Sequence, residues 1–317
     1  MIDLHCDTLM LCTLRQNYSL RRNSGAVSLE KMRAGGVLAQ CFAIFIPTGD
    51  EAAEEKLSLA PYEYYLEALK NYRWELENNR DLILPALCVE DIAANKAKGL
   101  MSSILTVEDA VLLEGDISRI RRLYNDGVRM MSLCWNYENE LCFPNSPDDS
   151  LMKLGLKDFG FNCVEEMNSL GMAVDVSHLS KGGFWDVVQH SRKPFAASHS
   201  CAFSLCPHPR NLDDEQLRAL ADKGGIVGLN FFPAFLSAEK SGSTELIIRH
   251  MKHIYNTSGI DCLSLGSDFD GFDMACEIDG CDKLPLLRRA METEFSPMEI
   301  EKICSLNALR FFRDCVN

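Results

Sequence analysis

The sequence lacks any CxxC pair, although it contains 14 cysteines in 317 residues. Closely spaced cysteine pairs are typical of structural zinc sites and redox motifs, so their absence argues against both. The cysteines are scattered, and Cys41, Cys88, Cys134 and Cys262 fall within apolar runs, where a thiol packs as a small hydrophobic side chain. Disulfide frameworks belong to short secreted chains. We therefore predict free thiols, most of them buried.

Basic clusters and long apolar runs are also missing. The chain has 32 basic and 46 acidic residues, for a net charge of −14, and no basic block stands out. This balance argues against nucleic acid and anionic membranes as partners. Asp3, His5 and Asp7 interrupt the apolar start of the chain, which is unlike a signal peptide. The most apolar stretch, GVLAQCFAIFIP, is too short to cross a membrane. We expect a cytoplasmic protein.

Short apolar runs alternate with helix-like segments from one end of the chain to the other. Several runs are continuously apolar, as strands buried on both faces should be. This alternation, with no linker and no repeat, predicts a single (β/α)₈ barrel over residues 1–317. A two-layer, doubly wound sheet is the alternative. The expected strands are residues 1–5, 37–46, 82–89, 102–108, 128–135, 172–178, 194–200, 225–232 and 262–268.

Nine expected strands are one too many for a barrel of eight. Residues 82–89 are the segment we place outside it, because Pro85 lies in the middle of the run and has no N–H for the strand ladder. The stretch 136–160 is rich in Asn, Pro, Asp and Gly, and we expect a long loop over the top of the barrel there.

Three helices have recognisable signals. Residues 61–79 are expected to form a long surface helix. Either Asp213 or Asp214 can cap a helix that ends near residue 224. Near the C-terminus, Ser296 is the expected N-cap of a helix in which Glu299 completes a capping box.

Residues of metal-binding type recur where the expected strands end. The C-terminal strand ends of a barrel form one rim, on which active sites are built, so these side chains should converge. Imidazole and carboxylate without thiolate is the ligand set of a hydrolytic zinc site. Three histidines with even two of the three carboxylates exceed the needs of one tetrahedral ion, which favours two metals and a shared carboxylate. The residues are His5 and Asp7 after the first barrel strand, Glu108 after the third, His178 after the fifth, His199 after the sixth and Asp268 after the eighth.

Five motifs in this order resemble those of the membrane dipeptidase (renal dipeptidase) family of the amidohydrolase superfamily. They are IDLHCDT, VDVSHLS, ASHSCA, HPRN followed by LDDEQLR, and GSDFDG, and the resemblance runs from residue 2 to about residue 312. It implies a (β/α)₈ barrel with two zinc ions that hydrolyses dipeptides, often with a D-residue at the C-terminal position. It also implies a homodimer.

The resemblance further implies two ligand pairs, one for each zinc ion: His5 with Asp7, and His178 with His199. A glutamate bridges the two ions, and TVEDAVLLEGD offers Glu108 and Glu114. The family's usual Glu-Gly spelling favours Glu114. Glu108, however, ends the apolar run SSILTV, and its distance to the following GVR stretch matches the family better. We therefore predict Glu108.

The remaining site residues also follow from the resemblance. Asp268 matches the catalytic aspartate, and Arg210 of HPRN matches the arginine that binds the free carboxylate of the substrate. The vertebrate enzymes have a histidine after the fourth strand that contacts the substrate, but here SLCWN places Trp135 in that part of the substrate site. This departure keeps open a related binuclear amidohydrolase acting on another amide or a lactone. A catalytically silent relative that serves as a binding protein is the more remote alternative.

The expected mechanism is hydrolysis by a hydroxide that bridges the two zinc ions. Metal binding lowers the pKa of the water toward neutrality. Asp268 would take the proton and pass it to the leaving amine, and a carboxylate grip by Arg210 would restrict substrates to very short peptides. The remaining histidines are expected to be surface or helix residues without a ligand role: His190, His208, His250 and His253.

Overall fold

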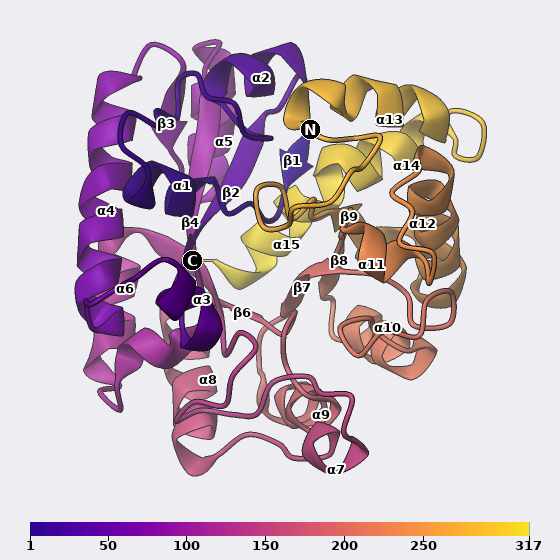
Figure 1. Ribbon diagram of the computed structural model, residues 1–317. Coiled ribbons are helices and arrows are strands. Elements are labelled where there is room, and N and C mark those ends of the chain that lie inside the picture. Colours follow the sequence, from indigo (N-terminus) through magenta and orange to yellow (C-terminus); the bar gives the residue numbers. More distant parts are fainter. Residues whose placement is uncertain (317) are drawn as a thin grey trace.

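Parallel strands form a closed barrel in the computed structural model, which describes residues 1–316 (Figure 1). Every strand pairing is parallel, and the circle closes through the pairing of the second and third barrel strands. The predicted (β/α)₈ barrel is confirmed, and the doubly wound alternative is wrong. The barrel strands are β1 (Ile2–Asp3), β2 (Ala39–Phe45), β4 (Met101–Glu108), β5 (Val128–Ser132), β6 (Ala173–Asp175), β7 (Ala196–Ser200), β8 (Ile226–Leu229) and β9 (Leu263–Leu265).

The remaining strand, β3 (Ile83–Pro85), lies outside the barrel, as predicted. Within residues 1–316 it pairs with β4 alone, along Met101–Ser103, while β5 pairs with β4 further along. Strand β2 therefore neighbours β4 directly, and their ladder runs over seven register pairs. A strand ending at Pro85 lacks the N–H groups for a central position.

The ladder is uneven around the barrel. In the described part of the chain, β1 and β9 share one register pair, Asp3 with Leu265. Strands β6 and β7 likewise share one pair, Asp175 with Ala196. At the β6–β7 junction the backbone ladder ends before the rim, so other contacts must hold those strand ends together. At the β1–β9 junction backbone pairing resumes at the rim, where Cys6 pairs with Phe269 and the N–H of Asp7 donates to the carbonyl of Phe269 at 2.9 Å.

Helices surround the barrel (Figure 1). Three 3₁₀ turns cover Ala110–Leu113, Ile260–Cys262 and Cys281–Lys283, and a π-helical turn covers Lys302–Leu306. The α-helices are α1 (Thr8–Leu14), α2 (Leu29–Ala34), α3 (Gly49–Glu54), α4 (Pro61–Asn78), α5 (Val89–Ala97), α6 (Ser118–Asp126), α7 (Asp149–Met152), α8 (Asp158–Leu170), α9 (Lys181–His190), α10 (Asp214–Asp222), α11 (Pro233–Leu236), α12 (Thr244–Ser258), α13 (Leu284–Met291), α14 (Pro297–Glu301) and α15 (Asn307–Cys315).

The helix signals in the sequence correspond to real helix ends. Helix α4 covers the expected segment 61–79. Asp213, rather than Asp214, caps α10, and its carboxylate accepts the N–H of Gln216. Ser296 and Glu299 form the expected capping box of α14.

The expectation of one long loop over residues 136–160 is wrong in part. Asp148 caps the short helix α7 by accepting the N–H of Ser150. Helix α8 then begins at Asp158, inside the expected loop. The cause is local capping within a segment whose composition is typical of turns.

Two apolar cores hold the barrel and its helices together. One fills the space between the strands and the surrounding helices. The other lies at the beginnings of the strands, where Ile2, Ala39 and Ile226 pack with Phe311 and Phe312 of α15. All 14 cysteines are free and 11 of them are buried, which confirms the prediction of unpaired, mostly buried thiols. Among residues 1–316, none of the helices combines the length and the apolar character that a bilayer-crossing segment requires.

Candidate metal centre

Strand ends bring the six predicted ligand and catalytic residues to one rim of the barrel. All six side chains are buried. Aspartate and glutamate are almost never fully buried unless they are paired. The expected convergence is therefore present. His5 and Asp7 follow β1, Glu108 is the last residue of β4, His178 follows β6, His199 lies in β7 and Asp268 follows β9.

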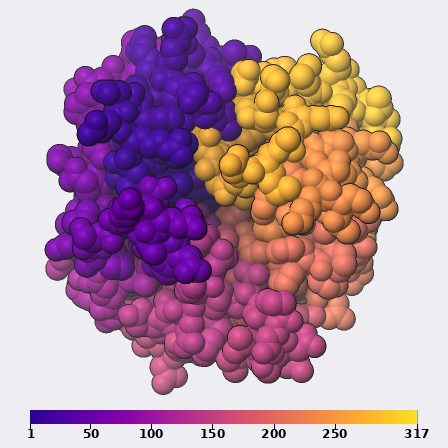
Figure 2. Space-filling model, viewed as in Figure 1, coloured from indigo at the N-terminus to yellow at the C-terminus, as the bar shows by residue number. Residues whose placement is uncertain are grey.

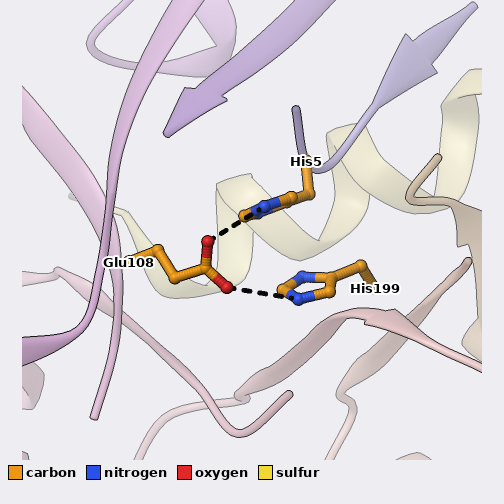
Figure 3. A group of neighbouring side chains, drawn as sticks. All are labelled: His5, Glu108 and His199. Atoms are coloured by element: carbon orange, nitrogen blue, oxygen red, sulfur yellow. Dashed lines mark ion pairs between the residues drawn. The ribbon is translucent and has the colours of Figure 1, made fainter. Parts of the chain in front are cut away.

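Glu108 lies at the middle of this group, with its two carboxylate oxygens facing different histidines (Figure 3). Oε2 lies 3.4 Å from Nε2 of His5. Oε1 lies 3.4 Å from Nε2 of His199 and 2.8 Å from Nε2 of His178. A carboxylate placed in this way can bridge two cations.

Two of the histidines lie closer together than a hydrogen bond between them can explain. Nε2 of His178 lies 3.0 Å from Nε2 of His199, and two unprotonated ring nitrogens are both acceptors. On the other side, Nε2 of His5 lies 3.2 Å from Oδ2 of Asp7, while Oδ1 of Asp7 is buried with no hydrogen-bond partner among the described residues. Cations held between these groups would satisfy them all, so the residues fit bound metal.

Nearby positive charge would stabilise the buried carboxylates of the group. Burial raises the pKa of Asp7 to about 8 and that of Asp268 to about 6, although the nearby His5 lowers both. Burial alone would lower the pKa of His5, but Asp7 and Glu108 raise it well above its usual value. A protonated His5 thus supplies the charge that a metal ion would bring.

The other histidines have the opposite tendency. Burial, followed by the nearby Arg210, lowers the pKa of His178 to about 4. Burial and His5 hold the pKa of His199 well below its usual value. Burial would raise the pKa of Glu108, but the three histidines outweigh it and keep this pKa low. Neutral imidazoles around a charged carboxylate are the protonation states that metal binding requires.

Glu114 lies elsewhere. It follows the 3₁₀ turn Ala110–Leu113 in a left-handed conformation, and its side chain is one-third exposed. Its carboxylate accepts a hydrogen bond from Arg119 at 2.7 Å. The structure thus brings Glu108, and not Glu114, to the histidines.

Arg210 borders the group from the loop after β7. Its side chain is buried, and one guanidinium nitrogen lies 3.0 Å from Nε2 of His178. The guanidinium also lies 5.3 Å above the ring of Phe235. Its other two nitrogens, Nε and Nη1, are buried and make no hydrogen bond within residues 1–316. Buried donors without partners are rare, and a guanidinium fork matches a carboxylate.

A cavity of about 330 Å³ opens above the group and is lined by Asp7, Glu108, His178, Arg210 and Asp268 among others. Figure 2 shows this face of the molecule hollowed near its centre. Aromatic side chains form two walls. Trp135, the residue at the departure from the family pattern, packs edge-on against Phe45 at 4.8 Å. Phe232 and Phe235 line the other part of the cavity.

Three residues of the site escaped sequence analysis. His208 lines the cavity beside Phe235, so the expectation of a surface or helix residue is wrong for it. Asn136 accepts a hydrogen bond from Nδ1 of His178 at 3.1 Å, and Asn230 donates to Asp268 at 2.8 Å. Asn136 lies in the segment SLCWN that already stood out, whereas nothing in the sequence around Asn230 indicates its role.

Comparisons with known proteins agree with this arrangement. The family model of membrane dipeptidases (peptidase family M19) matches residues 1–317. An uncharacterised protein from the pqqA 5′ region of Klebsiella pneumoniae is 35% identical over 239 residues, which cover 72% of this chain and 87% of that protein. An uncharacterised dipeptidase of Schizosaccharomyces pombe is 31% identical over 297 residues, covering 90% of this chain and 71% of that protein.

A solved structure extends the similarity to the whole fold. The metallo peptidase of Rhodobacter sphaeroides, liganded with a phosphinate mimic of the dipeptide L-Ala-D-Ala, has a TM-score of 0.87 and 27% sequence identity to this chain. The match covers 99% of this chain and 98% of that one.

Proposed function

The chain belongs to the membrane dipeptidase family and is a metallodipeptidase, and we propose that it uses two zinc ions to hydrolyse dipeptides, including those with a D-residue at the C-terminal position. The observation that carries the substrate class is the buried guanidinium of Arg210, which has two unpaired donors in the cavity that also exposes the carboxylate–imidazole group. The D-residue is proposed because the related metallo peptidase binds a mimic of L-Ala-D-Ala.

Two sets of residues would hold the metals. His5 and Asp7 would bind one ion and His178 and His199 the other, with one oxygen of Glu108 directed to each. Zinc suits a set of imidazoles and carboxylates without thiolate. When bound, the ions would supply Lewis acidity toward the scissile carbonyl and a water of lowered pKa.

Asp268 is the proposed proton carrier. Its carboxylate lies at the rim beside His5, with 3.8 Å between Oδ1 and Nε2 of that ring. Its other oxygen accepts the hydrogen bond from Asn230, which fixes the direction of the carboxylate. From this place Asp268 would take the proton released by the attacking water and deliver it to the leaving amine.

Arg210 would hold the C-terminal carboxylate of the substrate. A charge-assisted contact from the unpaired Nη1, made together with the second N–H of Nη2, would anchor one end of the dipeptide close to the metal ligands. Because the cavity is small, the N-terminal part of a longer peptide held by this anchor would not fit in it. Trp135 and Phe45 would contact the substrate through their rings.

A comparison of a dipeptide with its C-terminal amide tests this proposal. Arg210→Lys should raise KM for the free acid because a point charge cannot replace the planar fork. Arg210→Ala should raise it further, by roughly 30- to 150-fold, as expected for lost charge-assisted hydrogen bonds. The amide, which has no carboxylate, should be affected little. Arg218→Ala, in the exposed part of α10, is the matched control and should leave both substrates unchanged.

Equal cleavage of acid and amide by the wild-type protein would contradict the carboxylate anchor, especially if Arg210→Ala treated both alike. The amide or lactone substrates of a related binuclear amidohydrolase would then be the ones to examine.

A further inference from the structure

We infer that Asp175 and Ser198 position His199 through a hydrogen-bond relay that determines which ring nitrogen faces the metal centre. The inference rests on the proposed role of His199 as a metal ligand. Neither Asp175 nor Ser198 lines the cavity. Both are buried below the rim, so their effect on the centre passes through His199.

The positions of the hydrogens follow from the chemistry of the three groups. Ser198 Oγ donates to Oδ2 of Asp175 and lies 2.8 Å from Nδ1 of His199. A hydroxyl has one hydrogen, and a carboxylate only accepts. The hydrogen therefore lies toward Asp175, and Ser198 accepts the Nδ1–H of His199. Nε2 of His199 is left with its lone pair, directed toward Glu108.

Asp175 is held as an acceptor from several sides. Its Oδ1 accepts the N–H of Ser177 at 3.0 Å, the hydroxyl of Ser177 at 2.6 Å and the N–H of Ser198 at 2.9 Å. With these donors in place, the hydroxyl of Ser198 cannot turn toward His199 without leaving Oδ2 of a buried carboxylate unpaired. Such a loss is costly. The relay therefore has one stable orientation.

In this arrangement, which we call a clamp, an aspartate accepts both the N–H and the hydroxyl of a serine on the neighbouring strand. The same clamp occurs a second time in the barrel. Asp3 accepts the N–H of Ser267 at 2.8 Å with one oxygen and its hydroxyl at 2.6 Å with the other. In both cases the aspartate forms the single register pair of its junction, and the serine lies two residues beyond that pair. In both cases the next residue belongs to the proposed centre: His199 after Ser198, and Asp268 after Ser267.

The repetition explains how short ladders can support a rigid rim. The backbone pairing of β6 with β7 ends before the site residues. That of β1 with β9 resumes among them, since the N–H of Asp268 donates to the carbonyl of His5 at 3.3 Å. A carboxylate that binds both the N–H and the hydroxyl of the neighbouring strand extends each junction by two residues. At the β6–β7 junction the clamp also reaches an imidazole, which gives it a function beyond holding strands. Outer hydrogen-bond partners of this kind fix the tautomer and orientation of metal-binding histidines.

Measured zinc affinities distinguish a relay that acts on His199 from a clamp that only holds the two strands together. Ser198→Ala removes the acceptor of Nδ1 but leaves the backbone bond from residue 198 to Asp175. We expect the chelator-treated full chain to take up one zinc ion as the wild type does, and the second roughly 10- to 100-fold more weakly. Ser198→Thr keeps the hydroxyl and should bind both ions as the wild type does.

Ser200→Ala is the matched control. Ser200 flanks His199 on the other side in β7, is equally buried, and its hydroxyl has no hydrogen-bond partner in the part of the chain that the structure describes. Its removal should leave both zinc affinities unchanged. A Ser198→Ala variant that binds the second ion as tightly as Ser200→Ala would overturn the relay.

Nitrogen NMR of histidine-labelled protein gives a second readout that does not depend on the folding of any variant. In the zinc-loaded wild type, His199 should show a protonated Nδ1 and a coordinated Nε2. Coordination through Nδ1, or loss of its proton, would overturn the inference. If the wild type takes up no zinc at all, the proposed metal centre fails; if it takes up two ions and Ser198→Ala does the same with equal affinity, only the relay fails.

Discussion

At the scale of single residues, Glu108 is the proposed bridge between two metals. Its oxygens face His5 on one side and His178 and His199 on the other. Glu108→Gln should lose metal and activity together, because a neutral amide cannot balance two cations. Zinc content and turnover measured on the same preparation would check this.

Glu114→Gln is the control for that experiment. It removes a partly exposed ion pair with Arg119 and should be nearly silent, since such pairs contribute little. A Glu114→Gln variant that lost its metal while Glu108→Gln kept it would show that the glutamates have been assigned the wrong way round.

Asp268 can be tested without disturbing the backbone. It has a φ of +63°, and asparagine tolerates this left-handed conformation better than most residues. Asp268→Asn should therefore keep the fold and the metals but lower kcat by about 10²- to 10⁴-fold, as expected when a positioned acid–base group is lost. Zinc analysis combined with steady-state kinetics provides the check. Unchanged turnover with intact zinc would mean that Asp268 only holds its loop.

The residues of the centre could be predicted because each follows an apolar strand directly in the sequence. Their partners could not be predicted, because the contacts join residues far apart in the sequence. Asn230 reaches Asp268 from the end of β8, and Ser198 of β7 contacts Asp175 of β6. His208 was missed for a similar reason, because only the packing of its loop against Phe235 turns it toward the cavity.

At the scale of elements, His250 links α12 to two neighbouring segments. It is fully buried, its Nδ1 accepts the N–H of Ala202, and its Nε2–H donates to the carbonyl of Leu236. A neutral ring satisfies both bonds, whereas a second proton would face the N–H of Ala202. Burial, with His253 and Arg249 nearby, lowers its pKa from 6.5 to about 4.

This shift predicts a loss of stability in acid. Between about pH 6.5 and pH 4 the unfolded chain binds a proton at His250 that the folded chain does not, so the free energy of unfolding falls as the pH falls. The contribution reaches about 3 kcal/mol at neutral pH. Urea unfolding at several pH values gives the free energy of unfolding as a function of pH. Between about pH 4 and pH 6.5 this curve should be less steep in His250→Gln, by the equivalent of about one bound proton. The exposed His190→Gln is the control, and equal slopes in all three proteins would refute the prediction.

The elements themselves were largely predictable from the sequence. Apolar runs located all nine strands, and Pro85 correctly indicated the one outside the barrel. Capping residues located the starts of α10 and α14. The segment 136–160 was harder because its turn-forming residues, such as Asp148, also cap short helices.

At the scale of the whole molecule, the proposed metals should contribute to stability. The centre draws residues from five strands, so ions bound there would cross-link the barrel. Removing them with a chelator should lower Tm, and free zinc at about 100 times Kd should restore about 2.7 kcal/mol for each ion. Calorimetry with and without zinc, together with elemental analysis giving about two zinc ions per chain, is the test. A Tm indifferent to chelator, or one tightly held ion per chain, would contradict the binuclear centre.

The uneven ladder of the barrel also implies uneven access of solvent deuterium to its amides. The seven register pairs between β2 and β4 should keep their protons longest, because exposing them requires the whole seam to separate. The junction of β6 with β7 has one register pair and should exchange through smaller openings. These two strands carry His178 and His199 toward the rim. The proposed centre thus joins the two extremes of the barrel, because Glu108 ends the ladder of seven pairs and His178 and His199 follow the junction that has one.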